Sequence, residues 1–184
     1  GTEAIKTLLL GLPPATPGIL ITQHMPPGFT RTFAERLNKL TRLRVVEAKG
    51  GERVLPGSVF LAPGGQHLTL QKSGANYVTA LNDEPPLNRH KPSVDIMMNS
   101  VAHMAGVNAL GIILTGMGKD GAQGIHAIHT HGGYTFAQDE ATSVVFGMPK
   151  EAILLGGVNE IHSINDMAES LLSKLKTLSV GNRL

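Results

Sequence analysis

Two segments of the sequence share one pattern: an unbroken apolar run, then a loop rich in glycine or proline, then a helical repeat. The first segment is residues 18–28, GILITQHMPPG, and the second is residues 109–122, ALGIILTGMGKDGA. Each predicts a buried strand, a loop and a helix, the repeating unit of α/β proteins. His24 and Asp120 lie in these loops, just past the carboxyl ends of the strands. Open parallel sheets place their functional groups at that edge.

The rest of the chain supports the same fold class. The spacing of apolar residues predicts a strand at 134–138 and helices at 3–10, 29–40, 94–104, 122–131 and 165–178. Ser93 is the predicted cap of the helix at 94–104. Near residues 54–81, short β-rich pieces alternate with glycine-containing turns, which indicates a short antiparallel hairpin excursion. We therefore expect an α/β fold with a doubly wound, mostly parallel sheet, helices on both faces, and one domain over residues 1–184.

Composition excludes several classes of function. The chain has 184 residues, of which 41% are hydrophobic and 16% charged, as in a globular protein. It contains no cysteine, which excludes disulfides, thiolate zinc sites and cysteine nucleophiles. A net charge of +2 gives little support to nucleic-acid binding. No apolar run approaches the ~20 residues that span a bilayer, and the first residues lack a signal-peptide pattern. We expect a cytoplasmic protein without membrane insertion.

The imidazole and the carboxylate at the predicted sheet edge favour acid–base chemistry. An aspartate at a helix start commonly caps that helix, but the positive helix end also keeps the carboxylate ionised, which suits Asp120 to orienting an imidazole. His24 precedes Pro26 and Pro27, which restrict the backbone, and a neutral imidazole there is suited to taking a proton from a hydroxyl. The glycine-rich loop 116–121 exposes backbone amides to a developing oxyanion. These residues predict two members of a Ser-His-Asp triad.

The nucleophile of such a triad is missing from the sequence. Nine serines are present, yet none lies in a glycine-rich turn between a strand and a helix, the context that exposes a serine hydroxyl. Gly1 is followed at once by a predicted helix, as at the end of such a turn. We expect the first strand and the nucleophilic serine to lie immediately before residue 1.

Three other interpretations stay open at this point. Residues 116–121 match the G-x-G-x-x-G fingerprint, with Asp139 following after another strand, which is typical of a nucleotide-binding α/β domain. Against this, Asp120 places a negative charge where a pyrophosphate would bind. A non-enzymatic interaction domain explains the sheet but not the glycine loop. A metal site is disfavoured because no carboxylate at ligand spacing accompanies the three neighbouring histidines, His126, His129 and His131.

Several longer motifs point to one family. They are ITQHMP at 21–26, APG at 62–64, NRHKPSVD at 88–95, LTGMGKDGA at 114–122 and FGMPKEA at 146–152. In this order they strongly resemble the catalytic domain of the bacterial chemotaxis protein-glutamate methylesterases, the CheB family. The resemblance runs over essentially the whole chain.

The resemblance implies a serine hydrolase of class EC 3.1.1.61. Such an enzyme demethylates glutamate γ-methyl esters on chemoreceptors and deamidates some of their glutamines, without a cofactor or metal. By the same resemblance His24 is the general base, Asp120 its orienting carboxylate, and the backbone amide of Met117 an oxyanion donor. Arg89 and His90 are weaker candidates for substrate contact, with loop anchoring as the alternative.

The resemblance also implies how the chain relates to a larger protein. In the family the serine lies in a Ser-Thr-Gly-Gly turn whose last glycine corresponds to Gly1, so residues 1–184 alone are expected to be inactive. The family carries an amino-terminal receiver domain that the chemotaxis kinase phosphorylates, and nothing in this sequence matches it. The implied partners are methylated chemoreceptor helices, the receiver domain and the kinase, with no nucleic acid.

Overall fold

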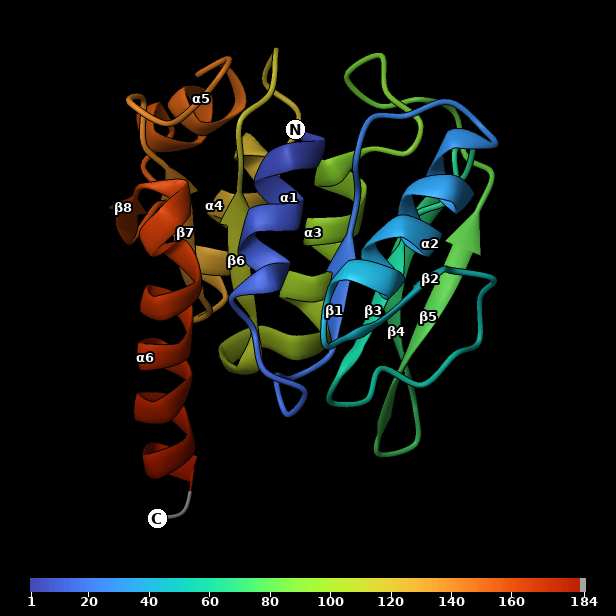
Figure 1. Cartoon of the computed structure of the whole chain (residues 1–184), viewed down its shortest axis with the longest axis horizontal. Helices are drawn as coiled ribbons and strands as arrows, with labels where there is room; N and C mark the ends of the chain where they lie inside the picture. The colour runs from blue at the N-terminus through green and yellow to red at the C-terminus, as the bar shows by residue number, and fades with distance from the viewer. Residues whose placement is uncertain (183–184) are drawn as a thin grey trace.

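The computed structural model describes residues 1–182, and the side chains of residues 1–178. Its strands form two parallel sheets and one antiparallel hairpin (Figure 1). The first sheet has the order β1-β3-β2 and the second β6-β7-β8. The strands are β1 Ile19–Ile21, β2 Arg44–Glu47, β3 Ser58–Leu61, β4 His67–Ser73, β5 Asn76–Asn82, β6 Leu110–Ile113, β7 Tyr134–Gln138 and β8 Glu160–His162. Strands β4 and β5 form the hairpin.

Helices cover both faces of the strands. They are α1 Thr2–Leu10, α2 Phe29–Leu40, α3 Val94–Ala105, α4 Ala122–Thr130, α5 Met148–Leu154 and α6 Ile164–Asn182, with a 3-10 turn η1 at Gly106–Asn108. In Figure 1, α1 and α2 lie in front of the strands, and α3 and α4 lie behind them. None of the helices in the described part of the chain combines the length and apolarity that a membrane crossing requires.

The alternation of side chains along β3 explains the layered arrangement. Phe60 enters the core that α3 and α4 cover, whereas Val59 and Leu61 enter the core shared with α1, α2 and α6. Successive residues of a strand point to opposite faces, so a strand that is buried on both sides reads as a continuous apolar run. The doubly wound α/β arrangement predicted from the sequence is confirmed.

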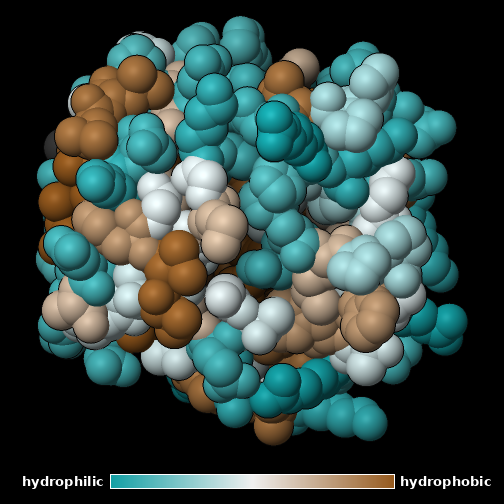
Figure 2. Space-filling view, turned by 90° about the horizontal axis from the view of Figure 1, so that it is seen from above, coloured by the Kyte–Doolittle hydropathy of each residue, from teal (hydrophilic) through white to brown (hydrophobic). Residues whose placement is uncertain are grey.

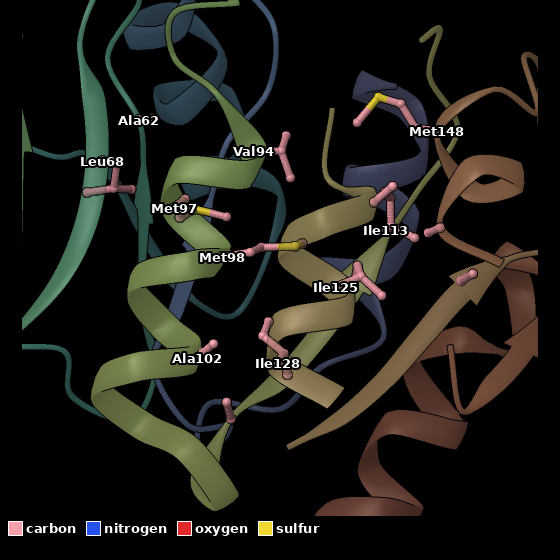
Figure 3. Close-up of a cluster of buried hydrophobic side chains, with 14 of the residues drawn as sticks. Ala62, Leu68, Val94, Met97, Met98, Ala102, Ile113, Ile125, Ile128 and Met148 are labelled. Atoms are coloured by element: carbon pink, nitrogen blue, oxygen red, sulfur yellow. The ribbon is translucent and has the colours of Figure 1, made fainter. Parts of the chain in front are cut away.

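Helices α3 and α4 pack closely and position the loops described below. Figure 3 shows Val94, Met97, Met98 and Ala102 on α3, with Met98 directed toward Ile125 and Ile128 of α4. A glycine makes the close approach possible: a Cβ added at Gly124 would lie 2.5 Å from Cβ of Met98. The methionines act as core packing, filling the space between the helices.

The structure corrects the prediction in two places. Residues 58–61, expected within the antiparallel excursion, form β3, which pairs in parallel with β1 and β2 at the centre of a sheet. Among the described residues, antiparallel strand pairing is confined to β4 and β5, apart from two isolated bridges, Arg53 with Val78 and Leu87 with His90. The sequence analysis also omitted α5 and β8, because these elements have only seven and three residues and β8 alternates exposed and half-buried positions at an edge. The predicted cap is confirmed, since Ser93 Oγ accepts a hydrogen bond from the Ile96 amide at 3.4 Å.

The close helix contact leads to a stability prediction. Replacing Gly124→Ala should lower the free energy of unfolding by about 1–3 kcal/mol, because the new methyl group overlaps Met98 despite the better helix propensity of alanine. Urea denaturation followed by circular dichroism measures the change. The matched control is Gln123→Ala on the exposed face of the same helix, expected within about 0.5 kcal/mol of the parent. Equal stability of G124A and the parent would contradict the packing described here.

Candidate active site

Asp120 lies where the amino-terminal ends of α3 and α4 meet. It follows the loop after β6, is buried, and accepts three hydrogen bonds from the start of α3. The donors are the Val94 amide at 2.7 Å, Ser93 Oγ at 2.8 Å and the Asp95 amide at 3.1 Å. Asp120 therefore caps α3, the neighbouring helix. The helix that follows Asp120 in the chain, α4, begins after Gly121, and Gly121 has no side chain to cap it.

Asp95, in the first turn of α3, in turn caps α4. Its Oδ1 accepts the Gly121 amide at 2.9 Å and the Gly124 amide at 2.8 Å. The side-chain amide of Asn88 bridges the two carboxylates, donating to Asp95 Oδ2 at 2.7 Å and to Asp120 Oδ1 at 3.1 Å. Each helix start thus holds the carboxylate of the other helix, and both helix dipoles favour the negative charge.

The environment shifts the pKa values of the two carboxylates in opposite directions. Burial raises the pKa of Asp120, but the hydrogen bonds that it accepts, above all from His24 and the Val94 amide, outweigh burial and lower its pKa from 3.8 to about 2. For Asp95, burial raises the pKa and the nearby charge of Asp120 adds to the effect, against the Gly124 amide that lowers it. Asp120 is therefore the more acidic of the two carboxylates, and it is ionised at neutral pH.

His24 contacts this ionised carboxylate directly. The residue follows β1, and its Nε2 lies 2.7 Å from Asp120 Oδ2, with 20% of the imidazole side chain exposed. Because the acceptor is a carboxylate, Nε2 carries the hydrogen and donates it. Among the described residues, Nδ1 has no hydrogen-bond partner. The imidazole therefore has one anchored nitrogen and one nitrogen available to a further group.

The loop between β5 and α3 brings His90 to the same place. The rings of His24 and His90 are stacked, with centroids 3.6 Å apart and planes 6° from parallel. Arg89, the other candidate for substrate contact, is an exposed residue on the same turn. The structure thus brings His24, Asp120 and His90 together and leaves Arg89 at the rim.

The loop that contains Met117 is held by the segment before α5. Gly116 donates its amide to the Val145 carbonyl at 3.0 Å and accepts the Met148 amide at 2.8 Å. Buried Gln138, at the end of β7, accepts the Thr115 amide at 2.8 Å. The Met117 amide has no acceptor among the described residues, and Met117 is 77% exposed. This amide is thus available on a loop that is fixed at both ends.

The start of α1 lies beside the residue that precedes His24. A Cβ added at Gly1 would lie 2.7 Å from Nε2 of Gln23, so the two residues are in contact. Figure 1 shows the N-terminus at the same end of the molecule as the loops after β1 and β6. Figure 2 views the molecule from that end, where apolar surface interrupts the polar surface. Exposed apolar residues that follow the carboxyl ends of these parallel strands are Phe29 at the start of α2, Met117 in the loop after β6, and Val144 in the loop after β7.

The other sequence candidates lie apart from this cluster or are otherwise engaged. His129 and His131 bond Asn159 and the Ala127 carbonyl at the far end of α4. No group of three or more potential metal ligands occurs among the residues described. The Gly121 and Gly124 amides, which a bound phosphate would need, are already held by Asp95, so the nucleotide-binding interpretation has no support here.

Sequence reasoning missed the residues that support the pair. Asn88 and Asp95 hold Asp120 and α4 as described, and buried His67 accepts the Ser93 amide at Nδ1 while Nε2 donates to the Pro85 carbonyl. The signal available for Asn88 and Asp95 was the motif at 88–95, which leads into the helix that Ser93 caps, whereas His67 is the first residue of β4 and lies outside that loop.

The fold and the site define an α/β protein with an imidazole–carboxylate pair at the carboxyl edge of parallel strands, the arrangement of hydrolases that use a catalytic triad. The sequence profile of the CheB methylesterase family matches residues 1–171, and the chain belongs to this family.

Known relatives agree with that assignment. The chain is 64% identical over 175 residues to a protein-glutamate methylesterase/protein-glutamine glutaminase of Nitrosomonas europaea, covering 95% of this chain and 49% of the relative. It is 58% identical over 184 residues to one of Burkholderia pseudomallei, covering 100% and 50%. The chain thus spans about half the length of these curated relatives. The crystal structure of the Thermotoga maritima CheB methylesterase catalytic domain superposes with a TM-score of 0.91 at 37% identity, covering 94% of this chain and 92% of that one.

The lowered pKa of Asp120 leads to a prediction about stability and pH. Because its pKa is about 2 in the folded protein and 3.8 ordinarily, Asp120 stabilises the fold above about pH 4, and this contribution is lost as the pH falls toward 2. Asp120→Asn should therefore cost about 2 kcal/mol at pH 7 and progressively less in acid. Urea denaturation at a series of pH values measures the difference.

The control for this prediction is Glu140→Gln, which also removes one carboxylate charge, from an exposed side chain. The difference in the free energy of unfolding between E140Q and the parent should stay constant across the same pH range. A difference for D120N that is independent of pH would contradict the lowered pKa.

Proposed function

We propose that the protein is a serine hydrolase that demethylates protein glutamate γ-methyl esters and deamidates certain protein glutamines. The observation that carries this proposal is the 2.7 Å hydrogen bond between His24 Nε2 and the ionised, buried carboxylate of Asp120. Membership in the CheB methylesterase family and the names of the relatives support the substrate class. Residues 1–184 act as the catalytic domain.

The proposed nucleophile is a serine in the segment that directly precedes Gly1 in the protein. Two features support this position. The start of α1 contacts Gln23, the neighbour of His24, and a nucleophile between a strand and a helix start is exposed at the sheet edge. The positive end of α1 also favours the negative charge that develops there during the reaction.

In the proposed reaction His24 moves the proton. Because Asp120 binds Nε2, Nδ1 is the nitrogen that accepts the serine proton, the reverse of the orientation in chymotrypsin-like proteases. The serine oxygen attacks the γ-carbonyl carbon, and the tetrahedral intermediate releases methanol, which takes the proton from His24. Water then attacks the acyl-enzyme with the same base, and the free glutamate leaves. With glutamine as substrate, ammonia is the first leaving group.

Asp120 and the Met117 amide complete the proposed machinery. Asp120 holds the tautomer of His24 and stabilises the imidazolium that forms, without itself taking a proton, in keeping with its pKa of about 2. The Met117 amide donates to the oxyanion of the tetrahedral intermediate, and an amide from the nucleophile turn is the second donor. The reaction needs no cofactor.

The proposed substrates and partners follow from the family. The substrates are methylated helices of chemoreceptor cytoplasmic regions, which places the protein in the cytoplasm. A receiver domain that the chemotaxis kinase phosphorylates is the proposed regulator. The exposed Phe29, Met117 and Val144 follow the carboxyl ends of parallel strands, as His24 and Asp120 do, and offer apolar contact to a protein substrate.

The proposal is tested with the protein that includes its natural sequence before Gly1. Asp120→Asn should lower the turnover of methylated receptor by about 10³- to 10⁴-fold, because the imidazole loses its orienting carboxylate. The release of methanol measures turnover, and a fluorophosphonate probe measures the reactivity of the serine.

Glu140→Gln, which removes an exposed carboxylate that has no hydrogen bond to His24 or Asp120, should keep full turnover and labelling. Near-full turnover of D120N would reject the proposed triad. Saturable NAD or ATP binding without serine labelling would favour a nucleotide-binding domain instead.

A further inference from the structure

The mechanism above leaves one close contact unused, the stack of His90 on His24. The centroid distance of 3.6 Å is a van der Waals contact, and the 6° angle makes it face to face. His90 therefore covers one face of the His24 ring, while Asp120 holds one edge through Nε2.

The backbone holds His90 over His24. Leu87 and His90 exchange two backbone hydrogen bonds, of 3.0 Å and 2.9 Å, around a tight turn. The two central residues, Asn88 and Arg89, have φ of 54° and 68°, as in a type I′ turn. Asparagine tolerates this conformation, whereas it is strained for arginine.

The turn is tied to the same carboxylates as the imidazole. Asn88 donates to both Asp95 and Asp120, and Ser93, three residues after His90, donates to Asp120 as well. The segment that carries His90 is thus fixed on both sides by the group that anchors His24. A strained turn held in this way is typical of a functional contact.

We propose that His90 is a positioning residue for His24: its stacked ring prevents the imidazole from rotating about its bond to Asp120 and keeps Nδ1 directed at the nucleophile. This proposal rests on the proposed function. His90 acts through its contact with His24 and not through a contact of its own with the substrate. A single hydrogen bond at Nε2 leaves the ring free to swing about that bond, and a parallel neighbour at 3.6 Å removes this freedom.

The charge of the two rings supports the same role. Burial lowers the pKa of His90, and the neighbouring His24 lowers it further, against Asp120, which raises it. The lowered pKa favours the neutral form of the His90 ring. A neutral aromatic face stabilises a cation stacked on it, so His90 also favours the imidazolium that His24 becomes when it takes the serine proton.

The first experiment tests the contact without any enzymatic assay. In residues 1–184 labelled with ¹⁵N-histidine, the long-range ¹H–¹⁵N spectrum of the neutral His24 imidazole should show one tautomer, with hydrogen on Nε2. His90→Ala should shift the His24 ring nitrogens toward the averaged values of a mobile imidazole, and His90→Phe, which keeps a flat ring in place, should restore the parent spectrum. An unchanged His24 spectrum in H90A would overturn the proposal.

The second experiment measures kinetics in the protein with its natural sequence before Gly1. H90A should lower kcat about tenfold, with KM within about twofold, because misplacing the base affects the chemical step and spares substrate binding. H90F should recover kcat to within about threefold of the parent. The control His103→Ala, an exposed histidine on α3, should match the parent.

The outcomes separate the two proposals. If H90F is as slow as H90A, or if KM rises while kcat is kept, His90 acts as a substrate contact or a titrating group and the positioning role is wrong. If the parent neither turns over methylated receptor nor reacts with fluorophosphonate, the proposed hydrolase fails, while the His24 spectrum still decides whether His90 holds the ring. Circular dichroism confirms that each variant is folded.

Discussion

The exchange of carboxylates between two helix starts is the interaction on which the rest of this structure depends. Asp120, from the loop before α4, caps α3, and Asp95, from the first turn of α3, caps α4. Two positive helix ends that meet in a buried place repel each other unless negative charge lies between them. Here that charge is supplied by side chains that also satisfy the free backbone amides, so helix packing and site electrostatics have one cause.

This arrangement explains how a buried aspartate stays ionised. A carboxylate away from water is costly unless each oxygen is hydrogen-bonded. Both oxygens of Asp120 accept hydrogen bonds. Ser93 Oγ donates to Oδ1, and the Val94 amide and His24 Nε2 donate to Oδ2. The imidazole thus has a fixed anion at Nε2 whatever the pH in the neutral range. The proposed proton transfer at His24 Nδ1 therefore depends on Asp120, a carboxylate that the fold itself requires.

The sequence predicts the large elements well because their apolar spacing is long and regular. It also predicts that His24 and Asp120 share one edge, since each lies in the loop that follows an apolar strand. It does not predict that Asp95 crosses to α4, because that pairing depends on how two helices meet in space. The stack of His90 on His24 was hidden for the same reason, because it depends on a turn with two left-handed residues. The parallel pairing of β3 was missed because a four-residue apolar run does not reveal its strand direction.

The most direct test of the account is the ionisation of Asp120, followed through its side-chain carboxyl ¹³C shift in residues 1–184 as the pH is lowered. The account predicts that Asp120 titrates near pH 2, so that only about a tenth of the molecules are protonated at pH 3. It also predicts a higher midpoint in His24→Ala, which lacks one hydrogen bond to the carboxylate. A midpoint near the ordinary 3.8 that His24→Ala leaves unchanged would contradict the account.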